Sequence, residues 1–351
     1  MTGAEAVIKT SIESGINVCF TNFGTTELHL IAALDSVPGI RPVLCLFEGV
    51  CSGASDGYAR MLDKPAMTLL HLGPGLSNAM ANLHNAKRAH SQMFSVIGEH
   101  ALWHRGSDAP EIMDLETLAK PVSDLVHLAT SPETVSQDTS NAISCARRGN
   151  VATLIVPQDV QWSKCHNPEI ESGKIEPELV EPQNIDKIVR LLKRGRRTTM
   201  ILGSRGLRTR GLRASARIRS ATGCGLVAET LPGRMERGFG VPFIGRIPYS
   251  PELAFQYFSQ YESIILAGVQ APVAFFAYQN GRSKLLTENQ QTYMLGTRYQ
   301  DLEDALEQLA DTVDSTKQAV SLSSDSHHKR GNILPKGSLT PEKACMVLAV
   351  L

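Results

Sequence analysis

Apolar and polar residues alternate along the first half of the chain with two different periods. Runs that are apolar almost throughout, such as RPVLCLFE at 41–48 and MFSVIGEH at 93–100, have the character of buried strands. Segments between them, such as TELHLIAALDSV at 26–37, repeat their apolar positions with the period of an amphipathic helix. Apolar strands separated by helices are typical of a parallel sheet with both faces covered. We therefore expect residues 1–162 to form a doubly wound, mostly parallel α/β domain.

The other strands and helices expected in this domain follow from the same two patterns. Strands and helices take turns along the chain, which is the order that parallel strands with helical crossovers require. The expected strands are 16–24, 41–48, 64–75 with a turn at its end, 93–100 and 151–160, and the expected helices are 3–15, 26–37, 49–62 and 77–89.

The second half of the chain repeats the alternation after a polar connector. Residues 163–184 are rich in Pro and Glu and are interpreted as a linker, and residues 185–320 as a second, Rossmann-like α/β domain. A polar, breaker-rich segment at 321–338 is interpreted as a second linker. Segment 339–351 opens with Thr340 followed by Pro and Glu, which is typical of a helix N-terminus. We interpret it as a stub of a third domain.

The composition limits which kinds of partner the protein could bind and in which cellular compartment it could work. Lys and Arg together number 35, as do Asp and Glu, so no net charge favours nucleic acid or an acidic membrane surface. The seven cysteines are scattered and form no CxxC pair, which favours reduced thiols over a disulfide framework. The N-terminus lacks the pattern of a secretory signal, and no apolar run is long enough for a membrane helix. We expect a cytoplasmic protein that binds neither nucleic acid nor membrane.

Candidate chemistry gathers where three expected strands end. In open α/β sheets, ligands bind beyond the carboxyl ends of the strands, and glycines there allow backbone amides to approach a ligand. Parallel strands would bring the three ends to one edge of the sheet. The residues concerned are Gly24, Thr25 and Thr26 after the first strand, Glu48 after the second, and His71, Gly73, Pro74, Gly75 and Asn78 after the third.

Each of these residues also has a structural interpretation that the local sequence leaves open. Glu48 could cap the helix that follows it, because the helix macrodipole favours negative charge at that end. The GPG sequence at 73–75 could be no more than a tight turn ahead of a helix, and His71 could be a histidine with satisfied hydrogen bonds and no catalytic role.

Three motifs together resemble a known family. LFEGVCSGASDGYAR at 46–60, NFGTTELHLIAALD at 22–35 and HLGPGLSNAMANLHNAKRA at 71–89 are similar to the pyrimidine-binding domain of thiamine-diphosphate (ThDP) enzymes of the acetolactate synthase, benzoylformate decarboxylase and pyruvate oxidase group. The segment AGVQAPVAFFAYQNG at 267–281 resembles the central domain of an acetolactate-synthase-like subgroup. The final segment resembles the entry into the family's third, diphosphate-binding domain.

The resemblance implies a role for Glu48. In the family the corresponding glutamate hydrogen-bonds N1′ of the cofactor's aminopyrimidine and shares a proton with it, which favours the imino tautomer that removes the C2 proton of the thiazolium. The small residues after Glu48 would pack at a subunit interface. The cofactor-binding residues implied are Gly24, Thr25, Thr26, His71, Gly73, Pro74, Gly75 and Asn78.

The chain also departs from the family pattern. Phe47 replaces a histidine found in many relatives, and the segment VIGEHALWHRGSD at 96–108 replaces one that contains glutamine in acetolactate synthases. The family's Mg²⁺-binding GDG motif is absent, and we reject the sequence SDG at 55–57 with its downstream asparagines as a substitute. The basic stretch at 193–219 could bind the phosphates of FAD or ADP. A solvent-exposed basic face is the favoured interpretation.

Three hypotheses remain. The chain is the N-terminal part of a ThDP-dependent carboligase or decarboxylase of 2-oxo acids, which would form a homodimer or tetramer. Alternatively it is a non-catalytic homologue that binds or regulates a full-length partner, or a truncated gene model of a complete enzyme. In the first case the cofactor would be ThDP with Mg²⁺, although this chain lacks the Mg²⁺ ligands.

Overall fold

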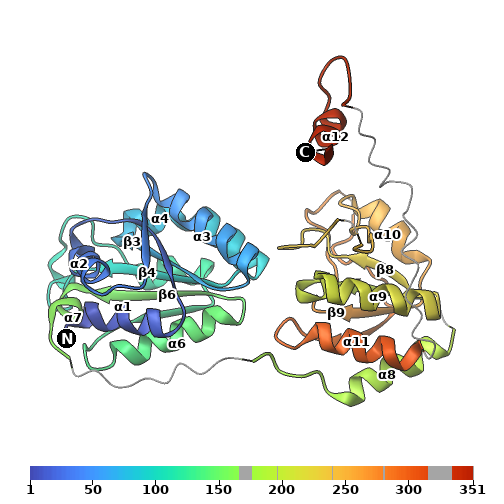
Figure 1. The fold of residues 1–351 in the computed structure, drawn as a ribbon, viewed down its shortest axis with the longest axis horizontal. Coiled ribbons are helices and arrows are strands. Elements are labelled where there is room, and N and C mark those ends of the chain that lie inside the picture. Colours follow the sequence, from blue (N-terminus) through green and yellow to red (C-terminus); the bar gives the residue numbers. More distant parts are fainter. Residues whose placement is uncertain (166–175, 196, 239, 280, 315–333, 351) are drawn as a thin grey trace.

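A six-stranded parallel sheet forms the centre of the first α/β unit (Figure 1). The structure is a computed structural model that describes residues 1–165, 176–195, 197–238, 240–279, 281–314 and 334–350. The strand order is β2-β1-β3-β4-β6-β5, with every neighbouring pair parallel. The strands are β1 (Val18–Asn22), β2 (Arg41–Leu44), β3 (Ala66–His71), β4 (Met93–Glu99), β5 (Leu125–Leu128) and β6 (Val151–Pro157).

Helices cover both faces of this sheet, as the near-continuous apolar strands predict. One apolar core joins the sheet to helices that include α1, α2 and α6, and a second core on the other face joins it to α3, α4 and α5. The α/β fold with a doubly wound parallel sheet is therefore confirmed. The helices are α1 (Gly3–Glu13), α2 (Leu28–Ser36), α3 (Glu48–Leu62), α4 (Leu72–Ala89), α5 (Leu115–Ala119), α6 (Val135–Arg147) and α7 (Gln158–Trp162).

The edge strand β2 differs from the buried strand expected at 41–48. It ends at Leu44, and the following residues lead directly into α3, whose first residue is Glu48. Leu44 is 66% exposed and Leu46 is 93% exposed. The apolar run is therefore a short edge strand followed by an exposed apolar segment, because the strand order places β2 at the rim, where it has one neighbour.

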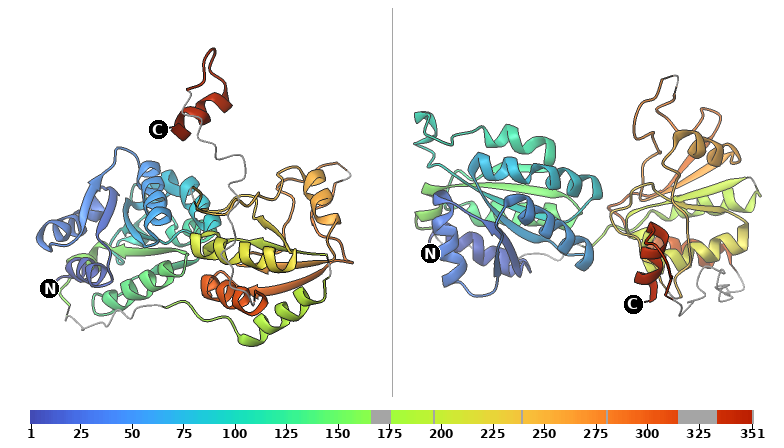
Figure 2. Two further views of the ribbon diagram at one scale, coloured as in Figure 1. Left: turned by 45° about the vertical axis from the view of Figure 1, so that its right-hand side comes forward. Right: turned by 90° about the horizontal axis from the view of Figure 1, so that it is seen from above.

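A four-stranded parallel sheet, in the order β10-β9-β7-β8, forms the second unit. Helices α8, α9 and α11 pack in one apolar core with the sheet, and α10 packs in another. Figure 2 shows the two units and α12 from two further sides. The elements are α8 (Pro182–Lys193), β7 (Thr198–Leu202), α9 (Thr209–Thr222), β8 (Gly225–Ala228), α10 (Pro251–Ser259), β9 (Ser263–Ala267), β10 (Gln291–Gly296), α11 (Leu302–Val313) and α12 (Pro341–Val350).

The expected element map omits β5, α5, α6, α7, α10 and β10, which the structure contains. The segment interpreted as the first linker, 163–184, includes the start of α8, and its residues 166–175 lie outside the described residues. Most of the second linker, 321–333, also lies outside them. The segment 339–351 contains α12, which begins at Pro341 as its N-terminal sequence predicts.

An aspartate at the end of α3 joins the two units. Asp63 has a left-handed backbone (φ 53°), and its carboxylate lies 2.6 Å from Nη2 of Arg208 and 3.5 Å from Nη1 of Arg234. Arg234 also donates to the backbone carbonyl oxygens of Arg60 and Met61, at 3.0 and 2.9 Å. The Arg208 side chain is only 12% exposed. A guanidinium so far removed from water depends on its anionic partner.

We expect Asp63→Asn to destabilise the contact between the units by about 1–2 kcal/mol, because Arg208 would lose its counter-ion while it stays largely buried. Asn tolerates the left-handed backbone, so the substitution tests charge and leaves the chain path intact. The melting temperature should fall by a few degrees relative to the chain with Asp35→Asn, a change on the exposed surface of α2. Equal melting temperatures would show that Asp63 does not join the units.

Candidate functional site

Glu48 lies at the amino end of α3, beyond the carboxyl end of β2. Its backbone starts the helix after Phe47, which has an extended conformation. The side-chain amide of Asn78, from α4, donates to Oε2 of Glu48 at 3.0 Å. A Cβ atom built on Gly75 would lie 3.6 Å from Cγ of Glu48, which is ordinary contact distance. The carboxylate is therefore held at the edge of the sheet by the Asn78 amide and by its place at the first residue of α3.

The GPG sequence forms the first turn of α4, so the expectation of a turn ahead of the helix is wrong. The helix begins at Leu72, which takes a left-handed backbone (φ 45°) and so turns the chain directly from β3 into the helix. A Cβ atom on Gly73 would lie 2.1 Å from Sδ of Met113. Gly73 thus gives room to the loop that follows β4, while Pro74 is exposed on the first turn.

His71 is held between two carboxylates at the carboxyl end of β3. Its Nδ1 lies 2.8 Å from Oε2 of Glu27 and 3.1 Å from Oγ1 of Thr26, and its Nε2 lies 3.3 Å from Oε2 of Glu111. The hydrogen bond to Glu27 raises the pKa of His71, an effect that partial burial opposes and Glu111 adds to. The histidine is therefore more basic than a free imidazole and has a fixed ring orientation.

Glu27 is the functional candidate that the sequence does not reveal. It lies in a short 3-10 helix, Thr25–Glu27, and its side chain is fully buried. Besides its contact with His71, it accepts hydrogen bonds from the hydroxyl of Thr26 at 2.5 Å and from the amide of Gly24 at 2.8 Å. Buried carboxylates need such donors. The only local signal is an acidic residue directly after two hydroxyl residues.

Two glycines leave room for this Glu27–His71 pair. A Cβ atom on Gly24 would lie 2.5 Å from Nδ1 of His71, and one on Gly98, in β4, would lie 1.7 Å from Oε1 of Glu27. Neither glycine has a positive φ, so sterics alone require glycine here. Gly98 must be glycine because of Glu27, which follows a strand two positions away in the sheet. The sequence around Gly98 does not reveal this requirement.

The structure brings most of the expected site residues together. His71 and Glu48 flank Gly75, since a Cβ atom there would lie 3.5 Å from Cβ of His71 and 3.6 Å from Cγ of Glu48. Gly24 and Thr26 contact His71, and Asn78 contacts Glu48. Thr25 is exposed at the rim. The edge of the sheet thus carries an outer carboxylate and a buried carboxylate–histidine pair side by side.

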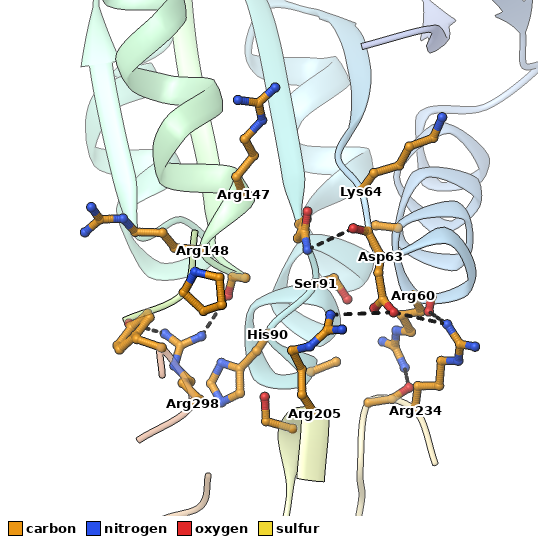
Figure 3. A pocket seen from close by; sticks show the side chains of 18 of the residues that line it. Arg60, Asp63, Lys64, His90, Ser91, Arg147, Arg148, Arg205, Arg234 and Arg298 are labelled. Carbon is orange, nitrogen blue, oxygen red and sulfur yellow. Dashed lines mark hydrogen bonds and ion pairs between the residues drawn. The ribbon is translucent and has the colours of Figure 1, made fainter. Parts of the chain in front are cut away.

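A hollow lies between the two units (Figure 3). Its volume is about 810 Å³, and many of its lining side chains are arginines. Most of these have acidic partners: Arg205 lies 3.0 Å from Glu303, and Arg210 lies 2.7 Å from Glu307. In the basic stretch at 193–219, expected to be a solvated face, five side chains pair with acids, and three of these five are also well exposed: Arg197, Arg205 and Arg210. Burial raises the pKa of Glu229, which also lines the hollow, to about 7.

The turn after β7 does not fit a dinucleotide. In a Rossmann-type site the phosphates occupy the amino end of the helix that follows the first strand. Here that end belongs to α9, and the amide and hydroxyl of Thr209 donate to Oε2 of Glu236 at 2.7 and 2.6 Å. A Cβ atom on Gly203 would lie 2.2 Å from Val269 and 2.7 Å from Oε1 of Glu229. The chain's own side chains thus occupy the position that a phosphate would take in a Rossmann-type site.

The described residues hold neither a metal-binding cluster nor a membrane-spanning helix. In the described part of the chain, no three His, Cys, Asp or Glu side chains come together in a way that could hold a metal ion. Asp56, of the rejected SDG sequence, instead pairs with Arg60 at 2.6 Å and accepts a hydrogen bond from Ser91. Over the same residues, no helix has the length and apolar character needed to cross a membrane.

Comparison with known proteins assigns the first unit. Residues 1–118 match the family described as thiamine pyrophosphate enzyme, N-terminal TPP binding domain. A Mycobacterium tuberculosis protein named "Putative acetolactate synthase large subunit IlvX" is 41% identical over 314 residues, or 89% of this chain and 60% of that protein. Residues 1–118 therefore carry the N-terminal domain of thiamine-diphosphate enzymes. The acetolactate synthase isozyme 3 large subunit of Escherichia coli is 28% identical over 162 residues, 46% of this chain and 28% of that protein.

Solved structures of ThDP-dependent proteins share the fold over almost the whole chain. A thiamine diphosphate-dependent 4-hydroxybenzoylformate decarboxylase from Rhodococcus jostii superposes with a TM-score of 0.76 at 20% identity, over 91% of this chain and 63% of that one. The benzoylformate decarboxylase of Polynucleobacter necessarius gives a TM-score of 0.72 at 17% identity, over 88% of this chain and 61% of that one. The chain spans about 60% of the length of these proteins and of the mycobacterial relative.

Gly24→Ala tests whether the buried pair needs the glycine beside it. The added methyl group would press on the His71 ring, which Glu27 holds in place, so we expect a loss of about 1–3 kcal/mol in the free energy of unfolding. Gly57→Ala is the matched control: a Cβ there meets nothing within 4 Å, and alanine in a helix should stabilise by about 0.5–1 kcal/mol. Denaturant unfolding measures both. A neutral Gly24→Ala would show that the ring is free to move.

Proposed function

We propose that the first unit binds the aminopyrimidine of thiamine diphosphate through Glu48 and serves in the decarboxylation or carboligation of a 2-oxo acid. The observation that carries this proposal is the Glu48 carboxylate at the amino end of α3, held by Asn78 beside Gly75. A carboxylate with one oxygen accepting from an amide has lone pairs left for a ring nitrogen or its proton. The family match of residues 1–118 and the mycobacterial relative named as a putative acetolactate synthase large subunit support the assignment.

The residues of the chain have separate tasks under this proposal. Bound thiamine diphosphate supplies the carbon that adds to the substrate carbonyl and accepts the electrons left when carbon dioxide departs. Glu48 holds or releases a proton at N1′ of the aminopyrimidine. The hydrogen bond with Glu27 raises the pKa of His71, which lies at the same sheet edge. In its protonated form His71 would attract the carboxylate of a 2-oxo acid.

The described residues fit one half of the cofactor. Glu48 lies at the sheet edge with one oxygen bound to the Asn78 amide, and Gly75 beside it carries no side chain, so a flat ring could approach the carboxylate there. The diphosphate and its Mg²⁺ need oxygen ligands in octahedral geometry, which the described residues do not bring together. We therefore assign to this chain the pyrimidine half of a site that a diphosphate-binding domain completes.

Glu48→Gln tests the assignment. In a complex of this chain with the diphosphate-binding domain of an acetolactate-synthase-like enzyme, exchange of the cofactor's C2 proton for deuterium should slow by about 10²-fold or more, because glutamine cannot take up the proton. Glu181→Gln, an exposed change just before α8, makes the same charge difference and should leave the rate unchanged. Undiminished exchange in Glu48→Gln would remove Glu48 from the mechanism.

A second candidate function is that of a non-catalytic partner of a full-length homologue. The observation in its favour is the exposed apolar surface next to Glu48, which comprises Leu44, Leu46, Phe47 and Val50. Edge strands with exposed apolar side chains pair with other chains unless something covers them. The same surface would serve a homodimer or tetramer, so it supports association under either function.

Leu46→Asp tests that association. A charge buried at the centre of an apolar contact should raise the dissociation constant at least tenfold. This corresponds to a loss of about 1.4 kcal/mol or more in binding free energy. Sedimentation of the chain, alone and mixed with a full-length acetolactate-synthase-like homologue, should show a dimer or mixed complex that Leu46→Asp dissociates. Leu179→Asp places the same change on another exposed leucine and should have no effect. Complexes that survive Leu46→Asp would place the contact elsewhere.

A further inference from the structure

The outward nitrogen of His71 is occupied by a carboxylate of the chain itself. Nδ1 faces the core and contacts the fully buried Glu27, while Nε2 lies 3.3 Å from Oε2 of Glu111, whose side chain is 54% exposed. Thr26 is the other polar side chain on the ring. Among the described residues, no other charged group is within ion-pair distance of His71. The solvent side of the imidazole is therefore reached through Glu111.

Glu111 belongs to a loop that the fold holds over the site. The loop follows β4 and is anchored by Arg105, which lies 3.4 Å from the buried Glu99 and 2.8 Å from Glu116. Met113 lies against Gly73, where the first turn of α4 has no side chain. These contacts tie both ends of the loop to the edge of the sheet, so the approach of Glu111 to His71 is built into the fold.

The backbone at Glu111 points to the same conclusion. Its φ of 70° lies in the left-handed region, which costs a residue with a Cβ atom free energy and is rare outside functional or tightly constrained positions. The loop accepts this conformation at the residue whose carboxylate meets Nε2 of His71. An anion on that nitrogen makes a charge-assisted hydrogen bond when the imidazole is protonated.

We propose that Glu111 is a specificity-determining residue that occupies Nε2 of His71 in the place of a substrate carboxylate. This inference rests on the proposed function for the identity of the substrate, a 2-oxo acid. An incoming carboxylate must displace Glu111 from the imidazole, so substrates that gain other contacts at the sheet edge are favoured over small anions. Glu111 thereby weakens the binding of simple carboxylates to His71.

Acetate is the probe that tests this competition, because it offers a carboxylate and little else. The chain with ¹⁵N-labelled histidine is titrated with acetate, and the His71 signals are assigned by their loss in His71→Gln. Glu111→Gln should lower the dissociation constant of acetate at His71 about fivefold, the scale of a partly exposed ion pair. In the absence of acetate, the same variant should lower the pKa of His71, which Glu27 still keeps above that of a free imidazole.

Asp108→Asn is the matched control. Asp108 lies in the same loop, also has a left-handed backbone, and asparagine accepts that conformation. It should change neither the acetate affinity nor the His71 pKa. An unchanged acetate affinity in Glu111→Gln, an unchanged His71 pKa, or no response of His71 to acetate in any variant would each overturn the proposal. The proton-exchange test of Glu48 involves neither acetate nor Glu111, so a failure of the proposed function and a failure of this inference would give different results.

Discussion

The burial of the Glu27 carboxylate is the constraint on which the rest of the site depends. A carboxylate removed from water must be satisfied by donors, and the amide of Gly24, the hydroxyl of Thr26 and the ring of His71 supply them. Each donor holds one segment at the sheet edge. Gly24 belongs to the turn after β1, Thr26 to the 3-10 helix, and His71 to the end of β3. Gly98 is confined to glycine because the carboxylate lies against it. One buried charge thus orders parts of three neighbouring strands, and it also gives His71 its orientation.

The outer carboxylate, Glu48, shows that a structural and a functional interpretation of one residue need not compete. Its position as the first residue of α3 satisfies the helix macrodipole, as the structural interpretation holds. The same position directs the side chain to the sheet edge, where only the Asn78 amide contacts it within hydrogen-bond distance in the described chain. A helix N-terminus therefore stabilises the group while leaving it open to a ligand. The two carboxylates differ in burial and so can differ in chemical task.

Local sequence predicted the parts of the site that depend on one strand and its following helix. The convergence of residues 24–26, Glu48 and 71–78 follows from parallel strands alone, and the structure places them at one edge. The roles of Glu27, Gly98 and Glu111 could not be predicted, because they arise between segments far apart in the chain. Leu46 is exposed because β2 lies at the edge of the sheet. The order of the strands in a sheet cannot be predicted from the apolar run itself. The helix starts at Leu72 because this residue takes a left-handed backbone, which the GPG motif does not predict.

The exposed apolar edge and the chemistry proposed for Glu48 are physically linked. A half-exposed carboxylate exchanges its proton with water, whereas a carboxylate removed from water has a higher proton affinity and shares its proton with a neighbouring ring nitrogen more effectively. Leu46 and Phe47 lie directly before Glu48 in the chain and are exposed, so a chain that covers them would also exclude water from the carboxylate. Association at this edge and proton sharing at Glu48 would then arise together. An isolated first unit can hold the residue in place, but a covering surface would give it the environment that its proposed role requires.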